Sequence, residues 1–193
     1  YVKSEKYVGD VMFTHFEKRF HELSGKTWGI IGLGNFGRRV ADIAKAFGCR
    51  VIYYSTSGKN SQQGYERVEF DALLEQSDIV SVHAPLDKNT RGLMNREAFR
   101  EMKSSAVFLN LGRGPIVVEQ DLADALEAGE IAGAGLDVLS AEPMRKDNPL
   151  RKIKDSERLI ITPHIGWASV EARTRLMEII CQQIADFQNQ IIL

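Results

Sequence analysis

Short apolar runs alternate with amphipathic segments along most of the chain. The first run, residues 27–31, ends in glycines and is followed by apolar side chains at helical spacing, such as Val40 and Ala44, up to Gly48. This succession predicts a strand, a glycine turn and a helix that ends at Gly48.

The same alternation continues as far as residue 162. Apolar runs predict strands at residues 51–54, 79–82, 106–109, 132–138 and 159–162. Amphipathic segments predict helices at residues 70–74, 96–102 and 121–128, the last of them capped by Gly129. We therefore expect an α/β fold with a Rossmann-type, doubly wound parallel sheet, whose ligand sites lie at the carboxyl ends of the strands.

The two ends of the chain depart from this alternation. Residues 1–23 mix aromatic and charged side chains without a sustained period, which predicts an irregular arm. Residues 24–168 form the expected dinucleotide-binding domain, and residues 169–193 contain a long helix. One face of that helix is apolar and carries Leu176, Ile179, Ile180, Ile184 and Phe187. This face either packs on the same domain or crosses to a neighbouring one, and the pattern does not decide between the two.

Composition narrows the class of protein without naming a partner. The 193 residues, 44% of them hydrophobic, fit one domain and a fragment of a second. A net charge of -1 gives no electrostatic reason to expect nucleic acid or an anionic membrane. Two cysteines indicate packed free thiols in a reducing compartment, and no apolar run predicts a membrane helix or a signal peptide. We expect a cytoplasmic protein without a metal site, of which this chain, beginning without Met, is a part.

A glycine-rich turn supplies the first candidate site. Residues 32–37 read G-x-G-x-x-G between a predicted strand and a predicted helix. Gly32 permits the tight turn, Gly34 lets the backbone approach a pyrophosphate, and Gly37 allows close helix packing. The pattern predicts a dinucleotide site; the alternative is a glycine turn without a ligand.

The loop after the second predicted strand bears on which dinucleotide binds. NAD sites of this kind carry an acid about 20 residues past the glycines, for the ribose 2′-hydroxyl. Residues 55–60, Ser-Thr-Ser-Gly-Lys-Asn, contain none. Because a carboxylate would repel a 2′-phosphate, its absence favours NADP, with Ser55, Thr56, Ser57 and Lys59 as candidate contacts. The alternative is a polar turn beside which NAD binds through fewer contacts.

Three further strand ends carry residues suited to acid/base chemistry. Arg113 lies between glycines after residue 109 and could hold a carboxylate with two parallel hydrogen bonds. Glu142 follows the next strand, and His164 follows the last; a histidine paired with a carboxylate can donate a proton to an alkoxide. Taken singly, these could be a surface ion-pair residue, a solvated acid and a turn histidine. Together, beside a dinucleotide site, they predict catalysis.

Five ordered motifs across residues 23–187 make the chain resemble the D-isomer-specific 2-hydroxyacid dehydrogenase family. They are residues 32–37, residues 83–86 with Thr90, residues 110–114, residues 135–138 with Glu142 and Pro143, and residues 162–166. A weaker similarity, at residues 167–173, is to the glycerate dehydrogenase or hydroxypyruvate reductase branch. The resemblance implies hydride transfer between NAD(P)H and a small 2-keto or D-2-hydroxy acid, with a hydroxypyruvate or glyoxylate type of substrate favoured.

The resemblance also assigns roles. It implies that Arg113 anchors the substrate carboxylate, that His164 is the general acid/base, and that Glu142 pairs with His164 and raises its pKa. It further implies that Asp137 contacts the nicotinamide carboxamide and that residues 83–85 line the adenosine side. The complete set expected to bind the cofactor is Gly32, Gly34, Asn35, Phe36, Gly37, Ser55, Thr56, Ser57, Lys59, His83, Ala84, Pro85, Thr90, Leu111, Gly112, Arg113, Asp137, His164 and Gly166.

Finally, the resemblance implies a second, substrate-binding domain of which only the C-terminal helix is present here. We therefore expect this chain alone to be poorly active, and we expect a homodimer formed through the cofactor domain, in which the arm takes part. Two alternatives stay open: a dinucleotide-sensing protein similar to transcriptional corepressors of the same fold, and a relative acting on phosphoglycerate, phosphonate or formate.

Overall fold

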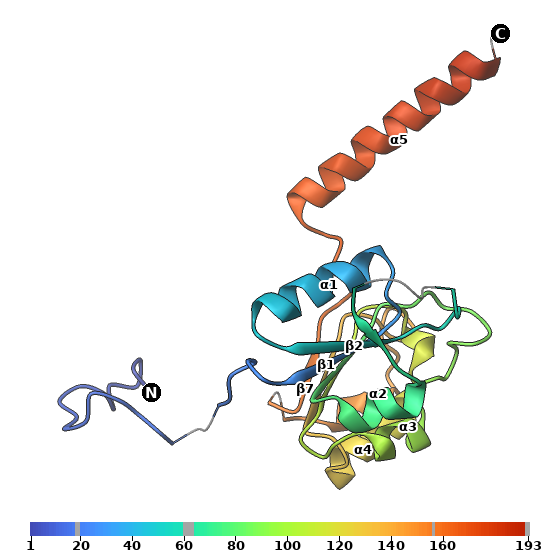
Figure 1. Cartoon of the computed structure of the whole chain (residues 1–193). Helices are drawn as coiled ribbons and strands as arrows, with labels where there is room; N and C mark the ends of the chain where they lie inside the picture. The colour runs from blue at the N-terminus through green and yellow to red at the C-terminus, as the bar shows by residue number, and fades with distance from the viewer. Residues whose placement is uncertain (18–19, 60–63, 156, 192–193) are drawn as a thin grey trace.

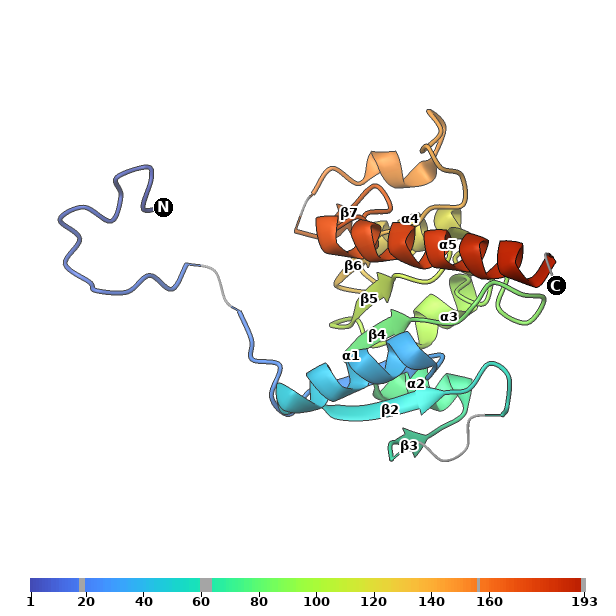
Figure 2. The same ribbon diagram turned by 90° about the horizontal axis from the view of Figure 1, so that it is seen from above.

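Seven strands lie in one parallel sheet in the computed structural model, which describes residues 1–17, 20–59, 64–155 and 157–191. Within these residues the strand order is β3-β2-β1-β4-β5-β6-β7 (Figures 1 and 2). The bounds are β1 Thr27–Ile31, β2 Arg50–Tyr54, β3 Glu66–Arg67, β4 Ile79–Val82, β5 Val107–Asn110, β6 Gly133–Leu136 and β7 Leu159–Ile161. The chain runs outward from β1 in one direction and then from β4 in the other, so the predicted doubly wound, Rossmann-type sheet is confirmed.

Helices cover both faces of this sheet. Their bounds are α1 Asn35–Ala46, α2 Phe70–Gln76, α3 Arg96–Glu101, α4 Glu119–Ala128 and α5 Val170–Ile191, with short 3-10 helices η1 Gly114–Ile116 and η2 Pro149–Lys152. Neighbouring strand residues point to opposite faces: Ile30 packs with α1, whereas Ile31 belongs to the core shared with α2, α3 and α4. The sheet thus separates two apolar cores.

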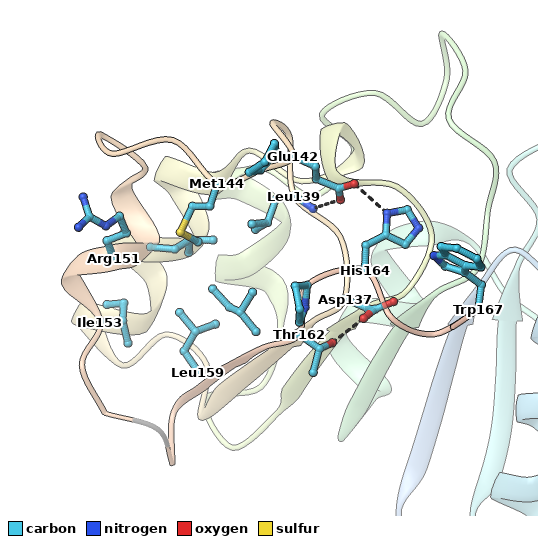
Figure 3. A pocket seen from close by; sticks show the side chains of 14 residues that line it. Asp137, Leu139, Glu142, Met144, Arg151, Ile153, Leu159, Thr162, His164 and Trp167 are labelled. Carbon is cyan, nitrogen blue, oxygen red and sulfur yellow. Dashed lines mark hydrogen bonds and ion pairs between the residues drawn. The ribbon is translucent and has the colours of Figure 1, made fainter. Parts of the chain in front are cut away.

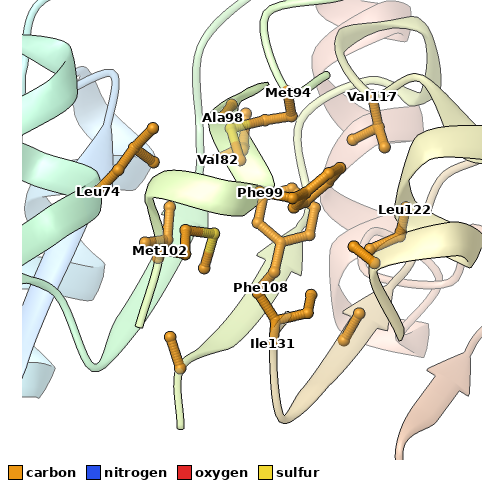
Figure 4. Close-up of a cluster of buried hydrophobic side chains, with 14 of the residues drawn as sticks. Leu74, Val82, Met94, Ala98, Phe99, Met102, Phe108, Val117, Leu122 and Ile131 are labelled. Atoms are coloured by element: carbon orange, nitrogen blue, oxygen red, sulfur yellow. The ribbon is translucent and has the colours of Figure 1, made fainter. Parts of the chain in front are cut away.

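The larger core lies under α2, α3 and α4 (Figure 4). Phe99 of α3 and Phe108 of β5, both without exposed surface, meet edge to face with ring centroids 5.4 Å apart. Such aromatic pairs contribute about 0.5–1.5 kcal/mol beyond the area that they bury. This core fixes β4, β5 and β6, whose carboxyl ends carry most of the candidate site.

Local signals set the helix ends where the sequence predicts them. Gly48 and Gly129 follow α1 and α4 with φ values of 82° and 73°, in the left-handed region that glycine adopts at low cost. Asn95 caps α3, because its side chain accepts a hydrogen bond from the backbone N–H of Ala98 at 3.0 Å. For the elements that the sequence predicts, predicted and observed bounds differ by at most two residues.

Three short elements do not appear among the predicted ones. They are β3, η1 and η2, of two, three and four residues. Elements this short do not complete a hydrophobic period, so pattern alone does not reveal them.

The two ends of the chain extend away from the sheet (Figure 1). The described part of the predicted arm contains no helix or strand, and Phe13 and Phe20 are about nine-tenths exposed. The apolar face of α5 is exposed as well, so packing on its own domain, one of the two alternatives, is not what the structure contains. No helix among the described residues is both long and apolar enough to cross a membrane.

Candidate active site

The turn after β5 is organised by one buried side chain. Asn110 has no exposed surface; its Oδ1 accepts a hydrogen bond from Gly112 N at 3.1 Å, and its Nδ2 donates to the Arg113 carbonyl at 3.1 Å. This clamp leaves the Arg113 side chain exposed, with its guanidinium donating to the Gly112 carbonyl at 2.8 Å. Arg113 is thereby held at the carboxyl end of the sheet.

The loop after β6 positions Glu142 and is supported from α4. Glu142 Oε1 accepts a hydrogen bond from Leu139 N at 2.8 Å. Glu119, at the start of α4, accepts from Ser140 N at 2.6 Å and from Asn148 Nδ2 at 2.8 Å. Sequence reasoning did not single out Glu119, because its partners lie more than 20 residues away in the chain.

Asp137 organises the turn that carries His164. Its Oδ1 accepts from Thr162 Oγ1 at 2.5 Å and from Ile165 N at 2.9 Å, and its Oδ2 accepts from Gly166 N at 2.9 Å. Partial burial opposes ionisation of this carboxyl, but the hydrogen bonds outweigh burial, and the pKa of Asp137 is lowered. The carboxylate therefore braces the turn in its ionised form.

His164 and Glu142 form the central pair of the site (Figure 3). His164 Nδ1 lies 2.7 Å from Glu142 Oε2, and both side chains are a little over one-third exposed. The hydrogen bond from His164, together with that from Leu139 N, lowers the pKa of Glu142. Because a carboxylate only accepts hydrogen bonds, Nδ1 carries its proton toward Glu142, and Nε2 is left for proton exchange with a ligand.

The backbone at His164 is itself unusual. Its φ of 54° lies in the left-handed region, which residues other than glycine adopt uncommonly. Such strain persists where surrounding contacts hold it, and it concentrates at functional sites. Here the contacts are those of Asp137 with the two residues that follow His164.

A cavity of about 760 Å³ opens beside this pair (Figure 3). Its polar rim includes Asp137, Glu142 and His164, and its remaining wall is largely apolar. Arg113 is not among the lining residues, and the described contacts include no hydrogen bond or ion pair between it and Glu142 or His164. The structure therefore brings two of the three predicted catalytic residues into contact and places the third on a neighbouring loop.

The glycine turn between β1 and α1 has the shape that a pyrophosphate requires. Gly32 has a φ of 93°, and a Cβ there would lie 2.7 Å from Ala84 N; a Cβ at Gly37 would lie 2.2 Å from the Gly32 carbonyl oxygen. Gly34, in contrast, faces open space, and the N-terminus of α1 has no side-chain cap. Free N–H groups at a helix N-terminus beside open space fit a phosphate group, so the cradle fits a dinucleotide.

Residues 55–59 follow β2 at the same edge of the sheet. Ser55 is buried, and its Oγ has no hydrogen-bond partner among the described residues. Thr56 is half-buried, Ser57 and Lys59 are exposed, and Asn60 lies outside the described residues. Arg67 of β3, which sequence reasoning missed, donates to the Gly58 carbonyl at 3.2 Å. The strand that carries it has only two residues, so no pattern revealed it.

The segment after β4 lies against both turns. Burial lowers the pKa of His83 to about 4, so this ring is neutral at neutral pH, and its Nε2 lies 3.1 Å from Ser81 Oγ. A Cβ at Gly112 would lie 3.0 Å from the carbonyl oxygen of the buried Ala84, which shows how closely the loops after β4 and β5 approach.

Thr90 stands out among the predicted cofactor contacts. It has no exposed surface, and its hydroxyl donates to the Pro85 carbonyl at 2.7 Å and accepts from Asp87 N at 2.8 Å. The hydroxyl is thus engaged within its own loop, and its direct contact with the cofactor stays a prediction. The remaining predicted contacts, Asn35, Phe36 and Leu111, are exposed.

The sequence of the chain matches a known protein family. Residues 2–166 match the family model described as "D-isomer specific 2-hydroxyacid dehydrogenase, NAD binding domain". The chain is 46% identical over 169 residues to a hydroxypyruvate reductase of Blautia hydrogenotrophica, a match that covers 86% of this chain and 51% of that protein. The chain spans about half the length of the curated relatives it matches.

Two solved structures share the fold over nearly the whole chain. A D-lactate dehydrogenase of Aquifex aeolicus, complexed with NAD and lactic acid, has a TM-score of 0.83 and 28% identity, covering 97% of this chain and 61% of that one. An acyclic imino acid reductase, in complex with NADPH and D-Arg, has a TM-score of 0.82 and 32% identity, covering 98% of this chain and 60% of that one. Similar folds thus occur with either dinucleotide.

Proposed function

Because the chain belongs to the D-isomer specific 2-hydroxyacid dehydrogenase family, we propose that it carries the dinucleotide cradle and the acid/base pair of an oxidoreductase that interconverts a small 2-keto acid and its D-2-hydroxy acid. The observation that carries this proposal is the 2.7 Å contact between His164 Nδ1 and Glu142 Oε2 at the carboxyl edge of a sheet with a dinucleotide cradle. A protein that only binds a dinucleotide would not need a histidine paired with a carboxylate at this position.

The proton chemistry falls to His164. In the reducing direction its Nε2 donates a proton to the carbonyl oxygen of the substrate, and in the oxidising direction it takes the proton from the hydroxyl group. Glu142 orients the ring and stabilises its charged form, because the carboxylate lies against the opposite nitrogen. A nicotinamide dinucleotide, when bound, supplies or accepts the hydride.

Arg113 is proposed to anchor the substrate carboxylate. A guanidinium holds a carboxylate through two parallel hydrogen bonds, which fixes the orientation of the 2-keto group as well as its position. In the structure one of its N–H groups donates to the Gly112 carbonyl, a neutral acceptor that a carboxylate can replace. Arg113 is therefore available for a substrate at little cost.

The dinucleotide is proposed to lie across the β1–α1 turn, with its pyrophosphate at Gly34 and its adenosine half toward residues 55–59 and His83. NADP(H) is favoured over NAD(H). NAD sites carry at this place a carboxylate that binds the ribose 2′-hydroxyl, whereas residues 55–59 carry hydroxyls and a cation, which suit a 2′-phosphate. Asp137 Oδ2 accepts one described hydrogen bond and has a lone pair left for the nicotinamide carboxamide.

The finer assignments rest on resemblance. A hydroxypyruvate or glyoxylate type of substrate is favoured, in line with the name of the Blautia relative. Residues 24–168 are proposed as the dinucleotide domain, α5 as the C-terminal helix of a substrate domain, and the arm as a contact in a homodimer. The exposed apolar side chains of the arm and the exposed apolar face of α5 support a covering partner for both.

Replacement of His164 in the full-length protein tests the function. His164→Gln should lower kcat by about 100-fold to 10,000-fold, the usual contribution of a general acid/base, while NADPH still binds. Kinetics with hydroxypyruvate and a fluorescence titration with NADPH separate the two effects. His21→Gln, in the exposed arm, is the matched control and should leave kcat unchanged. Full activity of the His164 variant would refute the proposal.

A further inference from the structure

We propose that Arg67 binds the 2′-phosphate of NADP(H), together with Ser55 and Lys59, and thereby sets the dinucleotide preference of this protein. The inference rests on the proposed function, because it places the adenosine half of the dinucleotide beside β2. The inference adds Arg67, from β3, to the contacts expected from the residues that follow β2. Arg67 would then be a residue that determines dinucleotide specificity.

The first observation is an unsatisfied group. Ser55 follows directly after β2 and is only 5% exposed. Its Oγ has no hydrogen-bond partner among the described residues. Buried hydroxyls are nearly always paired, so an isolated one at a strand end indicates a missing partner. A ribose oxygen or a phosphate oxygen supplies the kind of partner that this hydroxyl lacks.

The second observation is where Arg67 points. β3 pairs with β2 in the register Tyr53↔Arg67, which brings Arg67 alongside the end of β2. Its Nη1 donates to the Gly58 carbonyl at 3.2 Å, and Gly58 N in turn donates to the Ser55 carbonyl at 3.1 Å. The guanidinium therefore lies on the tight turn that begins at the unsatisfied serine.

The third observation is charge. The carboxylate of Glu66, next to Arg67 in β3, is already paired with Arg50, at 2.7 Å. Arg67 forms no ion pair among the described residues. Only one of its five N–H groups is used by Gly58, so the others can bind two oxygens of a phosphate group.

These observations select a phosphate ligand over a neutral one. Arg67 and Lys59 are exposed cations: Arg67 is hydrogen-bonded to the turn, Lys59 follows Gly58 in the chain, and residues 55–59 contain no acid. A ribose 2′-hydroxyl offers a neutral partner for Ser55 alone, whereas a 2′-phosphate carries about two negative charges and engages all three side chains. Arg67 should accordingly affect NADPH binding and leave NADH binding unchanged.

The test uses the full-length protein and parallel fluorescence titrations with NADPH and NADH. Arg67→Gln should weaken NADPH binding about tenfold, the size of one charge-assisted contact, and leave NADH binding as it is. Arg67→Lys should restore part of the NADPH affinity. Arg50→Gln, at the same sheet edge but paired with Glu66, is the matched control and should change neither affinity.

A second experiment uses competing ligands that contain no nicotinamide group. Adenosine 2′,5′-bisphosphate should displace NADPH better than AMP does in the wild type, and Arg67→Gln should remove that advantage. Equal loss of NADPH and NADH affinity in Arg67→Gln, or no loss of either, would overturn the inference. Wild-type preference for NADH would also overturn it while leaving the oxidoreductase proposal intact. Failure to bind either dinucleotide would overturn both.

Discussion

A Cβ added to Gly114 would lie 1.9 Å from the carbonyl carbon of Leu139. The two backbones pass so closely that no side chain fits between them. The contact joins the turn that presents Arg113 to the loop that presents Glu142, since Gly114 follows Arg113 and Leu139 N donates to Glu142. Two candidate catalytic residues therefore share one tight backbone contact.

Gly114→Ala should displace both loops. Overpacking in a rigid interior costs about 1–3 kcal/mol in unfolding free energy, and kcat of the full-length protein should fall with it. Gly135→Ala is a suitable control, because its Cβ would meet only the flexible end of the Leu109 side chain, at 2.9 Å. Denaturant unfolding and steady-state kinetics measure the two effects. Equal behaviour of the two variants would show that the contact is not restrictive.

Asp137→Asn should loosen the turn that holds His164. An amide offers one acceptor oxygen in place of two, so it loses the backbone hydrogen bond to Ile165 or to Gly166. A misplaced acid/base group can lower kcat by up to about a hundredfold, and we expect a fall of this kind in the full-length protein. Asp147→Asn, an exposed site with the same charge change, serves as the control. A turnover unchanged by Asp137→Asn would argue against the brace.

Burial of His83 should make the stability of the protein depend on pH. Its pKa is about 4 in the folded protein and 6.5 without burial, so below pH 6.5 the unfolded chain binds more protons than the folded one. The free energy of unfolding should therefore fall as the pH drops from 6.5 toward 4, by at most about 3 kcal/mol from this group.

His83→Asn removes this titration. Urea unfolding at pH 7 and at pH 4.5 should give a smaller difference for the variant than for the wild type, whereas His21→Asn in the exposed arm should behave as the wild type does. A pH dependence equally steep in the wild type and in His83→Asn would assign the effect to other groups.

Local signals in the sequence were sufficient to predict the main elements of the fold. The run before Gly32 and the glycines at 48 and 129 act over a few residues, so they predict β1, α1 and the end of α4. The family expected from the five motifs is confirmed. The residue types at positions 142 and 164 also indicated an acid/base pair, although their roles stay predictions.

Features that depend on distant contacts could not be predicted in this way. Asp137 braces a turn 28 and 29 residues further along the chain, and Arg67 meets Gly58 only because a two-residue strand joins the sheet edge. Neither arrangement leaves a period in the sequence. The apolar face of α5 was visible in the sequence, but an apolar stripe does not specify what covers it.

The order of the strands has a further consequence for how such a protein can change. β2 and β3, with residues 55–59 and Arg67, lie on one side of the junction between β1 and β4, whereas the loops with Arg113, Glu142 and His164 follow β5, β6 and β7 on the other. Substitutions at separated sites without shared partners usually have additive effects. In the proposed oxidoreductase, the choice between NADPH and NADH as reductant and the choice of acid substrate can therefore change independently of each other, in evolution or by engineering.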